Sequence, residues 1–261
     1  MRVKLIVLLV LIITTFVWAK DENENILEKY MKDNNVSGTV VIKSLKSGKT
    51  NIYNKERSEN KYLPASTFKI VNTLIALQEK IVKDENEIIK WNGKDYGMAV
   101  WNKDQNMKTA FATSCVWFYQ ELSKKIGNDI YLKYLKNINY GNEKTGPIVE
   151  SFWLEGDLRI TAVEQIELLR KIYNKELKFD ERNYIILKNI MKVDENEKYC
   201  VRAKTGVVGS VTPKIAWYVG YLETKDDVWF FACNIDYTKP EHLELRKQIV
   251  HSAFRELRII E

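Results

Sequence analysis

Histidine is scarce in this chain of 261 residues. Its two copies, His242 and His251, both lie near the C-terminus. Histidine is the commonest metal ligand among side chains and the usual base of a Ser-His-Asp triad. The sequence therefore offers few residues for a histidine metal centre or a Ser-His-Asp triad, and we expect no metal site.

Cysteine is almost as rare. The three copies, Cys115, Cys200 and Cys233, stand far apart in the sequence. None has the close spacing of a zinc site, and an odd number leaves at least one thiol unpaired.

The sequence also lacks a block of like charge. Its formal net charge is +6, from 41 basic and 35 acidic residues. Acids and bases alternate, as in "KDENENILEKYMKDNN", which is typical of a solvated surface and not of a nucleic-acid site. We see no internal repeat and no low-complexity linker. With 45% apolar residues, the chain can bury a sizeable core, and we expect residues 20–261 to form a single catalytic domain.

The N-terminus has the pattern of a signal peptide. Arg2 and Lys4 precede an apolar run from Leu5 to Trp18, and Val17 and Ala19 occupy the positions that a signal peptidase reads. We expect residues 1–19 to be removed and the protein to be exported, to the periplasm or the medium. The run is shorter than the ~20 residues of a membrane span. An uncleaved anchor remains the alternative, and we expect no other membrane contact.

The pattern of apolar residues predicts an α+β fold. Residues 36–54 form two short β runs around a Ser-Gly turn, and β-branched and aromatic runs return at 198–205, 214–224 and 227–236. The segment between them, from 63 to 192, has mostly helical periodicity, and 240–257 is helical again. We expect residues 20–62 and 193–261 to form one antiparallel sheet flanked by helices, and residues 63–192 to form a helical lobe.

A serine and a lysine lie three residues apart in "LPASTFKIVNTLIAL". Pro64 suits the first turn of a helix, and residues three apart share a face, so Ser66 and Lys69 point the same way. Apolar neighbours such as Phe68 and Leu74 disfavour the ammonium form of Lys69, which makes it a plausible base beside a hydroxyl nucleophile. The alternative is structural: Ser66 only begins the helix, and Lys69 extends along the apolar surface so that its amine reaches water. A second S-x-x-K, Ser58 to Lys61, is polar and has no apolar helix behind it.

Further short motifs follow in order. Ser114-Cys115-Val116 begins a predicted helix, Tyr140-Gly141-Asn142 lies in a loop, and Lys204-Thr205-Gly206 ends a β run. The K-T-G at 144–146 has no strand before it, and "SGKT" at 47–50 lacks the first glycine of a phosphate loop.

Taken in order, "STFK", "SCV", "YGN", "FWLEG", "KTG" and "WYVG" resemble the motifs of the class D β-lactamases, the oxacillinase family of serine enzymes. The resemblance runs from about Val36 to the C-terminus. Each motif is weak alone, but six in this order with fitting spacings are specific. The resemblance implies the fold shared by β-lactamases and transpeptidases, and hydrolysis of the lactam amide through a serine acyl-enzyme, giving antibiotic resistance.

Catalytic roles follow by resemblance at the matching positions. Ser66 is the expected nucleophile, and Lys69 is expected to bind CO2 as an N-carboxylysine that serves as general base. Trp153 of "FWLEG" would donate its indole N–H to that carbamate, its alternative being a core tryptophan. Ser114 would pass a proton to the lactam nitrogen, with Lys204 beside it. Beyond that CO2, no cofactor is expected.

Binding roles follow in the same way. The backbone N–H groups of Ser66 and Val207 would form the oxyanion hole. Arg246 in "LELRKQ" would grip the substrate carboxylate, or else lie exposed on a polar helix face. Val116 would shelter Lys69, and Thr205 and Gly206 belong to the substrate-binding strand. Trp101 would line the mouth of the cleft, while Tyr140 and Asn142 are expected to brace the helical lobe.

The sequence departs from the family pattern at two positions. Trp117 replaces a proline found in many members, and Val207 stands where an aromatic residue is frequent. Both put substrate preference in doubt more than the reaction. Cys115 has no histidine partner, so we expect a small buried filler.

Two alternatives remain: a β-lactam sensor domain that stays acylated, and a transpeptidase. In each case the partners are small β-lactams. We expect a monomer or a weak homodimer.

Overall fold

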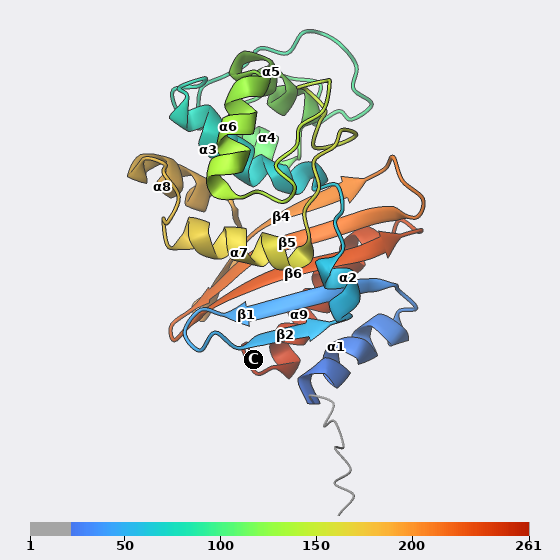
Figure 1. Cartoon of the computed structure of the whole chain (residues 1–261). Helices are drawn as coiled ribbons and strands as arrows, with labels where there is room; N and C mark the ends of the chain where they lie inside the picture. Colours follow the sequence, from blue (N-terminus) through green and yellow to red (C-terminus); the bar gives the residue numbers. More distant parts are fainter. Residues whose placement is uncertain (1–21, 261) are drawn as a thin grey trace, which may run out of the picture.

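A six-stranded antiparallel sheet forms the base of the molecule, with strand order β2-β1-β6-β5-β4-β3 (Figure 1). The structure is a computed structural model that describes residues 22–260. The predicted signal peptide, residues 1–19, lies outside them. The strands are β1 (Gly38–Ser44), β2 (Thr50–Tyr53), β3 (Lys192–Glu195), β4 (Tyr199–Val208), β5 (Lys214–Thr224) and β6 (Val228–Tyr237).

Helices cover both faces of this sheet. One face carries α9 (His242–Glu256), which packs on β5 and β6, with α1 (Glu22–Asp33) beside it. The other face carries α7 (Ala162–Tyr173), which packs on β1, β5 and β6. Beside it, α2 (Lys55–Glu59) packs on β1 and β2. The remaining helices are the 3₁₀ helix η1 (Ala65–Phe68), α3 (Lys69–Gln78), α4 (Met107–Ala112), α5 (Val116–Ile126), α6 (Asn128–Ile138) and α8 (Glu181–Ile190).

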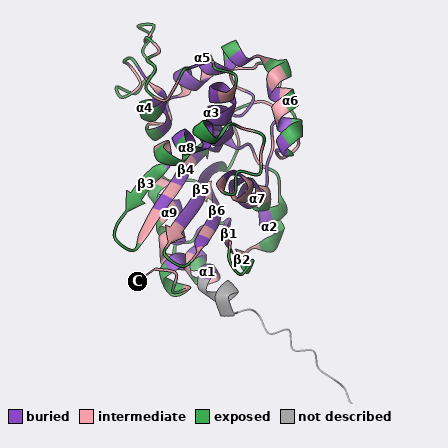
Figure 2. Ribbon diagram, turned by 90° about the vertical axis from the view of Figure 1, so that its left-hand side faces the viewer, coloured by how far each residue is buried: buried purple, intermediate pink, exposed green. Residues whose placement is uncertain are grey.

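The sheet separates two apolar cores. Alternation along β1 sends Val41 into the core on the lobe side and Val40 and Ile42 into the core under α9. The central strand β5 is buried on both faces from Ile215 to Leu222, and Figure 2 shows β5 and β6 mostly in the colour of buried residues. No helix within residues 22–260 is long and apolar enough to cross a membrane.

The expected fold class is confirmed: strands from both ends of the chain form one antiparallel sheet, with helices between them. β1 pairs with β6, so that Gly38 lies opposite Ile235. The β3 strand and α1 were not predicted. All four residues of β3 are exposed, so no apolar alternation marks the strand, and only its pairing with β4 produces it.

The α7 helix lies in the range expected to form the helical lobe, yet it packs against the sheet. Its start is fixed locally by a capping box, in which Thr161 accepts from the N–H of Glu164 and the Glu164 side chain accepts from the N–H of Thr161. Ile166 and Leu169 are buried on the same helix. Periodicity identifies this apolar face, but it does not say which layer covers it.

The Tyr-Gly-Asn motif ties the helical lobe to the loop that carries Trp153. Asn142 donates from its backbone N–H to the carbonyl of Arg159 at 3.0 Å, and from its side chain to the carbonyl of Asp157 at 2.7 Å. The N–H of Arg159 donates back to the side chain of Asn142 at 2.9 Å. Gly141 has a φ of +53°, and a Cβ there would overlap the Arg159 carbonyl oxygen. The bracing role expected for Asn142 has this physical basis.

We predict that Gly141→Ala lowers the free energy of unfolding by about 3 kcal/mol or more, because left-handed strain adds to a backbone overlap that no side chain can relieve. Gly48→Ala is the matched control: its φ is +70° but nothing lies within 4 Å. Its cost should be roughly 1 to 2 kcal/mol. Urea unfolding measures both, and equal losses would contradict the overlap.

Candidate active site

Ser66 and Lys69 lie at the junction of η1 and α3. Ala65, just before the serine, has a φ of +48°, and its N–H donates to the carbonyl of Trp153 at 2.9 Å. Ser66 is 9% exposed and Lys69 is fully buried. The Lys69 Nζ lies 2.9 Å from the Ser66 Oγ. The structure therefore brings the predicted nucleophile and base into hydrogen-bond contact.

The surroundings of Lys69 favour its neutral form. Burial lowers the pKa of Lys69 to about 7, with the nearby Cys115 thiol opposing this shift. The Nζ lies 5.1 Å from the centre of the Tyr119 ring, whose hydroxyl is held 2.9 Å from Thr73 Oγ1. Tyr119 was not among the predicted site residues, because a tyrosine inside an apolar helix is usually only a core residue. Cys115 is fully buried, as expected of a filler.

Ser114 is held in an unusual backbone conformation. It follows α4 with a φ of +55°. Its N–H donates to the Phe111 carbonyl at 3.2 Å, and the N–H of Cys115 donates to the Ala110 carbonyl at 2.8 Å. This is a Schellman end, in which glycine normally takes the left-handed position. A serine there carries strain of a kind that collects at functional sites.

Lys204 reaches Ser114 from the sheet. Its Nζ donates to the Ser114 Oγ and, at 3.0 Å, to the Thr205 carbonyl. The β4 strand lies close against η1 here. A Cβ on Gly206 would be 3.0 Å from the Pro64 carbonyl oxygen. The glycine of K-T-G therefore lets the two catalytic segments approach.

The site holds buried cations without carboxylate partners. Lys204 is 4% exposed and Arg246 is 6% exposed. Burial first, then repulsion from Lys69, Arg246 and Lys247, holds the pKa of Lys204 well below its usual value. Among residues 22–260, no ion pair involves Lys69, Lys204 or Arg246. A cluster of basic side chains without carboxylate partners favours the binding of an anion.

Trp153 packs in an aromatic cluster behind Lys69. Its ring stacks on Phe68 with centroids 5.8 Å apart, and Tyr131, Tyr140 and Phe152 surround the same Phe68 ring. The indole N–H of Trp153 is buried and has no hydrogen-bond partner within the described residues. Buried donors are normally satisfied, so this N–H is available to an acceptor that the protein itself does not supply.

The other predicted residues differ in their burial and in their hydrogen bonds. Arg246 of α9 donates from Nη1 to the Gly206 carbonyl at 2.8 Å, while its buried Nε has no partner. Thus it is not on an exposed helix face. Trp101 is half-buried, and its indole donates to the Thr113 carbonyl at 3.0 Å. Val116 is half-buried, and Val207 is exposed on β4.

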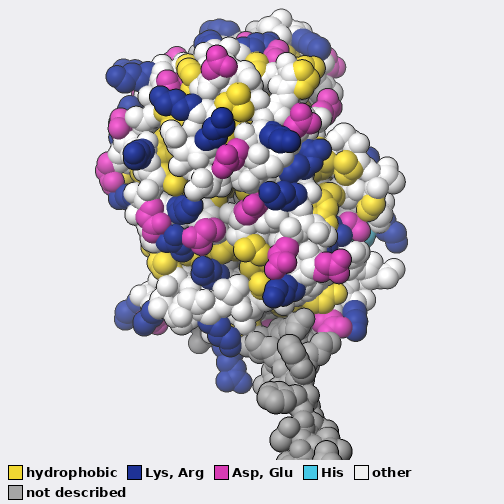
Figure 3. All heavy atoms as spheres, viewed as in Figure 1, with side chains coloured by type: hydrophobic (Ala, Val, Ile, Leu, Met, Phe, Trp, Pro, Cys, Tyr) yellow, Lys and Arg dark blue, Asp and Glu magenta, His cyan; other side chains and the backbone are white. Residues whose placement is uncertain are grey.

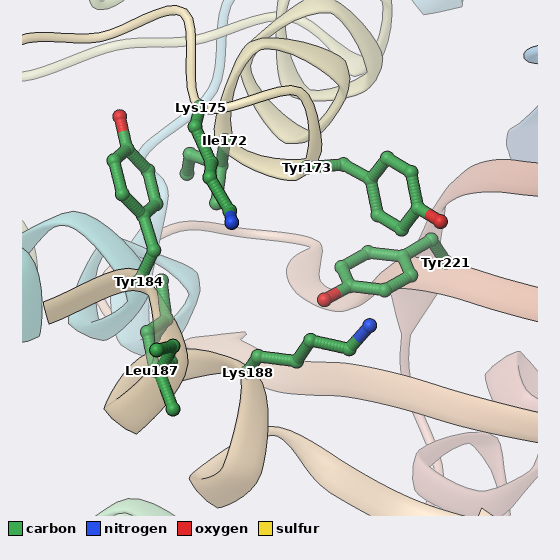
Figure 4. A pocket seen from close by; sticks show the side chains of 8 residues that line it. Ile172, Tyr173, Lys175, Tyr184, Leu187, Lys188 and Tyr221 are labelled. Carbon is green, nitrogen blue, oxygen red and sulfur yellow. The ribbon is translucent and has the colours of Figure 1, made fainter. Parts of the chain in front are cut away.

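A cavity of about 410 Å³ adjoins Lys204 and Thr205. It extends over the edge of the sheet to residues that were not predicted as site residues: Lys192, Asp194, Lys247 and His251. Lys247 follows Arg246 directly and His251 lies one turn further, a spacing that offered a signal once Arg246 was selected. A separate cavity of about 270 Å³ lies between α7, α8 and β5 and contains none of the predicted residues (Figure 4).

On the face shown in Figure 3, basic and acidic side chains are interspersed, and neither sign of charge is concentrated. Within residues 22–260, no group of three or more His, Cys, Asp or Glu side chains is arranged to hold a metal. The region holds two hydroxyl–amine contacts, Ser66 with Lys69 and Ser114 with Lys204.

Comparisons with known proteins agree with this geometry. A family model for the penicillin-binding protein transpeptidase domain matches residues 20–255. The β-lactamase OXA-48 of Klebsiella pneumoniae is 41% identical over 245 residues, which cover 93% of this chain and 91% of that one. The β-lactamase OXA-10 of Pseudomonas aeruginosa is 38% identical, with 82% of each chain covered.

A solved structure gives the same result. The class D β-lactamase FUS-1 (OXA-85) of Fusobacterium nucleatum subsp. polymorphum is 33% identical and superposes with a TM-score of 0.88. The match covers 91% of this chain and 99% of that one.

We predict that Lys69→Met raises stability relative to the parent by an amount that grows as the pH falls from about 10 to about 7. Above the ordinary pKa of 10.5, the amine is neutral in both states. As the pH falls toward 7, the unfolded chain gains a proton that folded Lys69 does not, so the parent loses stability. Below pH 7, Lys69 is protonated in both the folded and the unfolded chain, so the stability difference between Lys69→Met and the parent stays constant.

Urea unfolding in CO2-free buffer across this range measures the difference. Lys133→Met, at an exposed lysine of α6, is the control, for which the difference should stay flat. A flat profile for Lys69→Met as well would show that its amine titrates normally in the folded protein.

Proposed function

The chain belongs to the class D β-lactamases, and on this premise we propose that it hydrolyses β-lactam antibiotics through an acyl-enzyme on Ser66, giving resistance to them. The observation that carries the proposal is the contact between the Ser66 Oγ and the Nζ of a fully buried lysine, 2.9 Å away. A neutral amine has a lone pair that can accept the serine proton.

Acylation needs a base, an oxyanion site and a route for the departing nitrogen. Lys69 takes the proton from Ser66 as its Oγ attacks the lactam carbonyl carbon. The backbone N–H groups of Ser66 and Val207 stabilise the oxyanion. The first of these lies at the start of a helix, where unpaired N–H groups favour negative charge. Val207 lies in a stretch of β4 beyond the last residue paired with β3, Arg202, so no strand covers that edge.

The lactam C–N bond then breaks, and the nitrogen takes a proton. The Ser114 hydroxyl supplies it, because Ser114 accepts a hydrogen bond from the Lys204 amine and its own proton is directed elsewhere. Lys204 in turn replaces that proton on Ser114. The left-handed backbone at Ser114 accompanies the contact of its hydroxyl with the Lys204 amine.

Deacylation needs a base that can take a proton from the attacking water, and an amine that still holds the proton of Ser66 has no lone pair for it. A carbamate formed from CO2 on Lys69 would supply an anionic base when bound. The residues fit such a group: the amine is held neutral, the Trp153 indole N–H has no other acceptor, and apolar walls limit water. The alternative is that Lys69 works as a free amine throughout.

Substrate binding follows from the charge of the site. A penicillin-type substrate carries one carboxylate beside the lactam ring, and Lys204 and Arg246 have no anionic partner of their own. We assign this carboxylate to Thr205 and Arg246, whose Nε is buried and unpaired. Trp101, Val116 and Val207 shape the rim. Export through residues 1–19 would place the enzyme where it meets the antibiotic.

A sensor domain or a transpeptidase would share the acylation step but not the release of product. The relatives that match this chain are named as β-lactamases, which favours turnover. Multiple-turnover hydrolysis of a penicillin supports the enzyme, whereas a single stoichiometric burst would identify a sensor or a transpeptidase.

We predict that a slowly hydrolysed penicillin forms one covalent adduct per chain and that Ser66→Ala abolishes it, because we assign the nucleophile to Ser66, whose Oγ lies 2.9 Å from the Lys69 Nζ. Intact-protein mass spectrometry measures the adduct. Ser58→Ala is the matched control, since Ser58 also begins an S-x-x-K sequence but donates its hydroxyl to the Lys55 carbonyl at 2.7 Å. It should retain the adduct, and an adduct that persists in Ser66→Ala would refute the assignment.

We predict that Trp153→Phe weakens CO2 binding by Lys69 roughly 10- to 100-fold, the factor expected for one hydrogen bond to a charged group. The phenyl ring preserves most of the contact with Phe68. Carbon-13 NMR with labelled bicarbonate measures the carbamate, and stopped-flow kinetics should show deacylation slowed more than acylation. Trp91→Phe, which removes an indole N–H bonded to the Lys94 carbonyl at 2.8 Å, serves as the control. A carbamate of undiminished affinity in Trp153→Phe would exclude the indole as its donor.

A further inference from the structure

The cavity beside Lys204 lies on the open edge of the sheet. β3 pairs with β4 only as far as Arg202, so the strand beyond it has no neighbour on that side. Thr205 and Lys204 form one wall of the cavity, Lys247 and His251 of α9 form another, and Lys192 and Asp194 come from β3. The space is therefore continuous with the predicted carboxylate-binding strand.

Positive charge predominates in this cavity. Lys192 and Lys247 line it, against one carboxylate, that of Asp194. Lys204 also lines it, but its lowered pKa favours the neutral amine, so it is not counted. Lys247 lies near enough to Lys204 to depress its pKa by repulsion. Arg246 does not line the cavity, since it is buried and bonded to Gly206. The accessible cations next to Thr205 are therefore lysines of α9 and β3.

Both of these lysines can exchange their present partners for a ligand. Lys247 contacts Glu244 at 2.9 Å and Lys192 contacts Glu195 at 2.7 Å. The side chains of both glutamates are more than half exposed. Exposed pairs of this kind contribute about 0 to 1 kcal/mol, so an anion inside the cavity competes with them at little cost.

The size of the cavity is ample for a substituent of the substrate. Its volume of about 410 Å³ falls within the range of about 300 to 1,000 Å³ that is typical of small-molecule pockets. In the proposed binding mode the carboxylate lies at Thr205, which also lines the cavity, so a substituent on the neighbouring ring carbon is within reach of it. In cephalosporins, this neighbouring carbon carries the variable substituent of the six-membered ring.

We propose that this cavity is a specificity subsite in which Lys247 and Lys192 bind a second anionic group of the substrate, carried on the ring carbon next to the carboxylate. The inference rests on the proposed β-lactam hydrolysis and names a class of substrate for it. Cephalosporins with an acidic substituent at that carbon are the preferred members of this class.

The test compares three cephalosporins that differ only in the charge of this substituent: anionic, neutral and cationic. For the parent enzyme, kcat/KM should be higher for the anionic compound than for the neutral one. Lys247→Gln should reduce the ratio of anionic to neutral kcat/KM about fivefold to tenfold, and Lys247→Glu should shift the preference toward the cationic compound. Added salt should lower the ratio in the parent and raise it in Lys247→Glu, because salt screens an attraction in the first case and a repulsion in the second.

Lys175→Gln is the matched control. Lys175 also lines a cavity and pairs with a single exposed glutamate, Glu181, but that cavity lies between α7, α8 and β5 (Figure 4). The ratio of anionic to neutral kcat/KM in Lys175→Gln should equal that of the parent. Hydrolysis of all three compounds, with an unchanged ratio in Lys247→Gln and in the double variant with Lys192→Gln, would overturn the subsite alone. A parent that forms no acyl-enzyme and turns over none of them would overturn the proposed function itself.

Discussion

The burial of one amine governs the architecture of the site. A lysine that is wholly removed from water loses the solvation of its charged form, so it stays neutral where a surface lysine is protonated. Lys69 is in this position, and no carboxylate among residues 22–260 forms an ion pair with it to restore the charge. Its surroundings are the rings and aliphatic groups of the helical lobe. The lobe thus stabilises the fold and sets the protonation state of the base with the same contacts.

Much of the remaining structure holds other groups against this amine. The aromatic cluster around Phe68 positions Trp153, and the loop from 153 to 160 is bound to the Tyr-Gly-Asn motif through Asn142. The sheet contributes Lys204 through a strand that lies so close to η1 that a Cβ at residue 206 would be only 3.0 Å from the Pro64 carbonyl oxygen. Three segments that are distant in the sequence therefore meet where each has a specific backbone requirement: Ala65 and Ser114 in left-handed conformations and Gly206 without a side chain.

The sequence predicts the parts of this arrangement that are local. The three-residue spacing of Ser66 and Lys69, the apolar residues after them and the alternation along β5 and β6 each follow from one helix or strand, and the structure agrees with them. Ser114 was found by its motif, but its left-handed backbone was not predicted, since serine has no strong preference for that conformation. The position of Arg246 depends on how α9 packs on the sheet, and periodicity does not determine that packing. Lys192 and Lys247 were missed for the same reason: a polar lysine on a helix or an edge strand becomes part of a site only when the tertiary fold leaves a cavity beside it.

The pairing of β1 with β6 has a consequence for when the enzyme can exist during synthesis. Gly38 and Ile235 are strand partners from opposite ends of the chain, and the central strands β5 and β6 come after the whole helical lobe. Contacts of such long sequence separation form slowly, because the loop between them must close first. A nascent chain lacks β4 to β6 until most of it has been made, so the chain that emerges from the ribosome has an incomplete sheet and no functional cleft. The cleft forms only after the last strands have been made and have paired with the first.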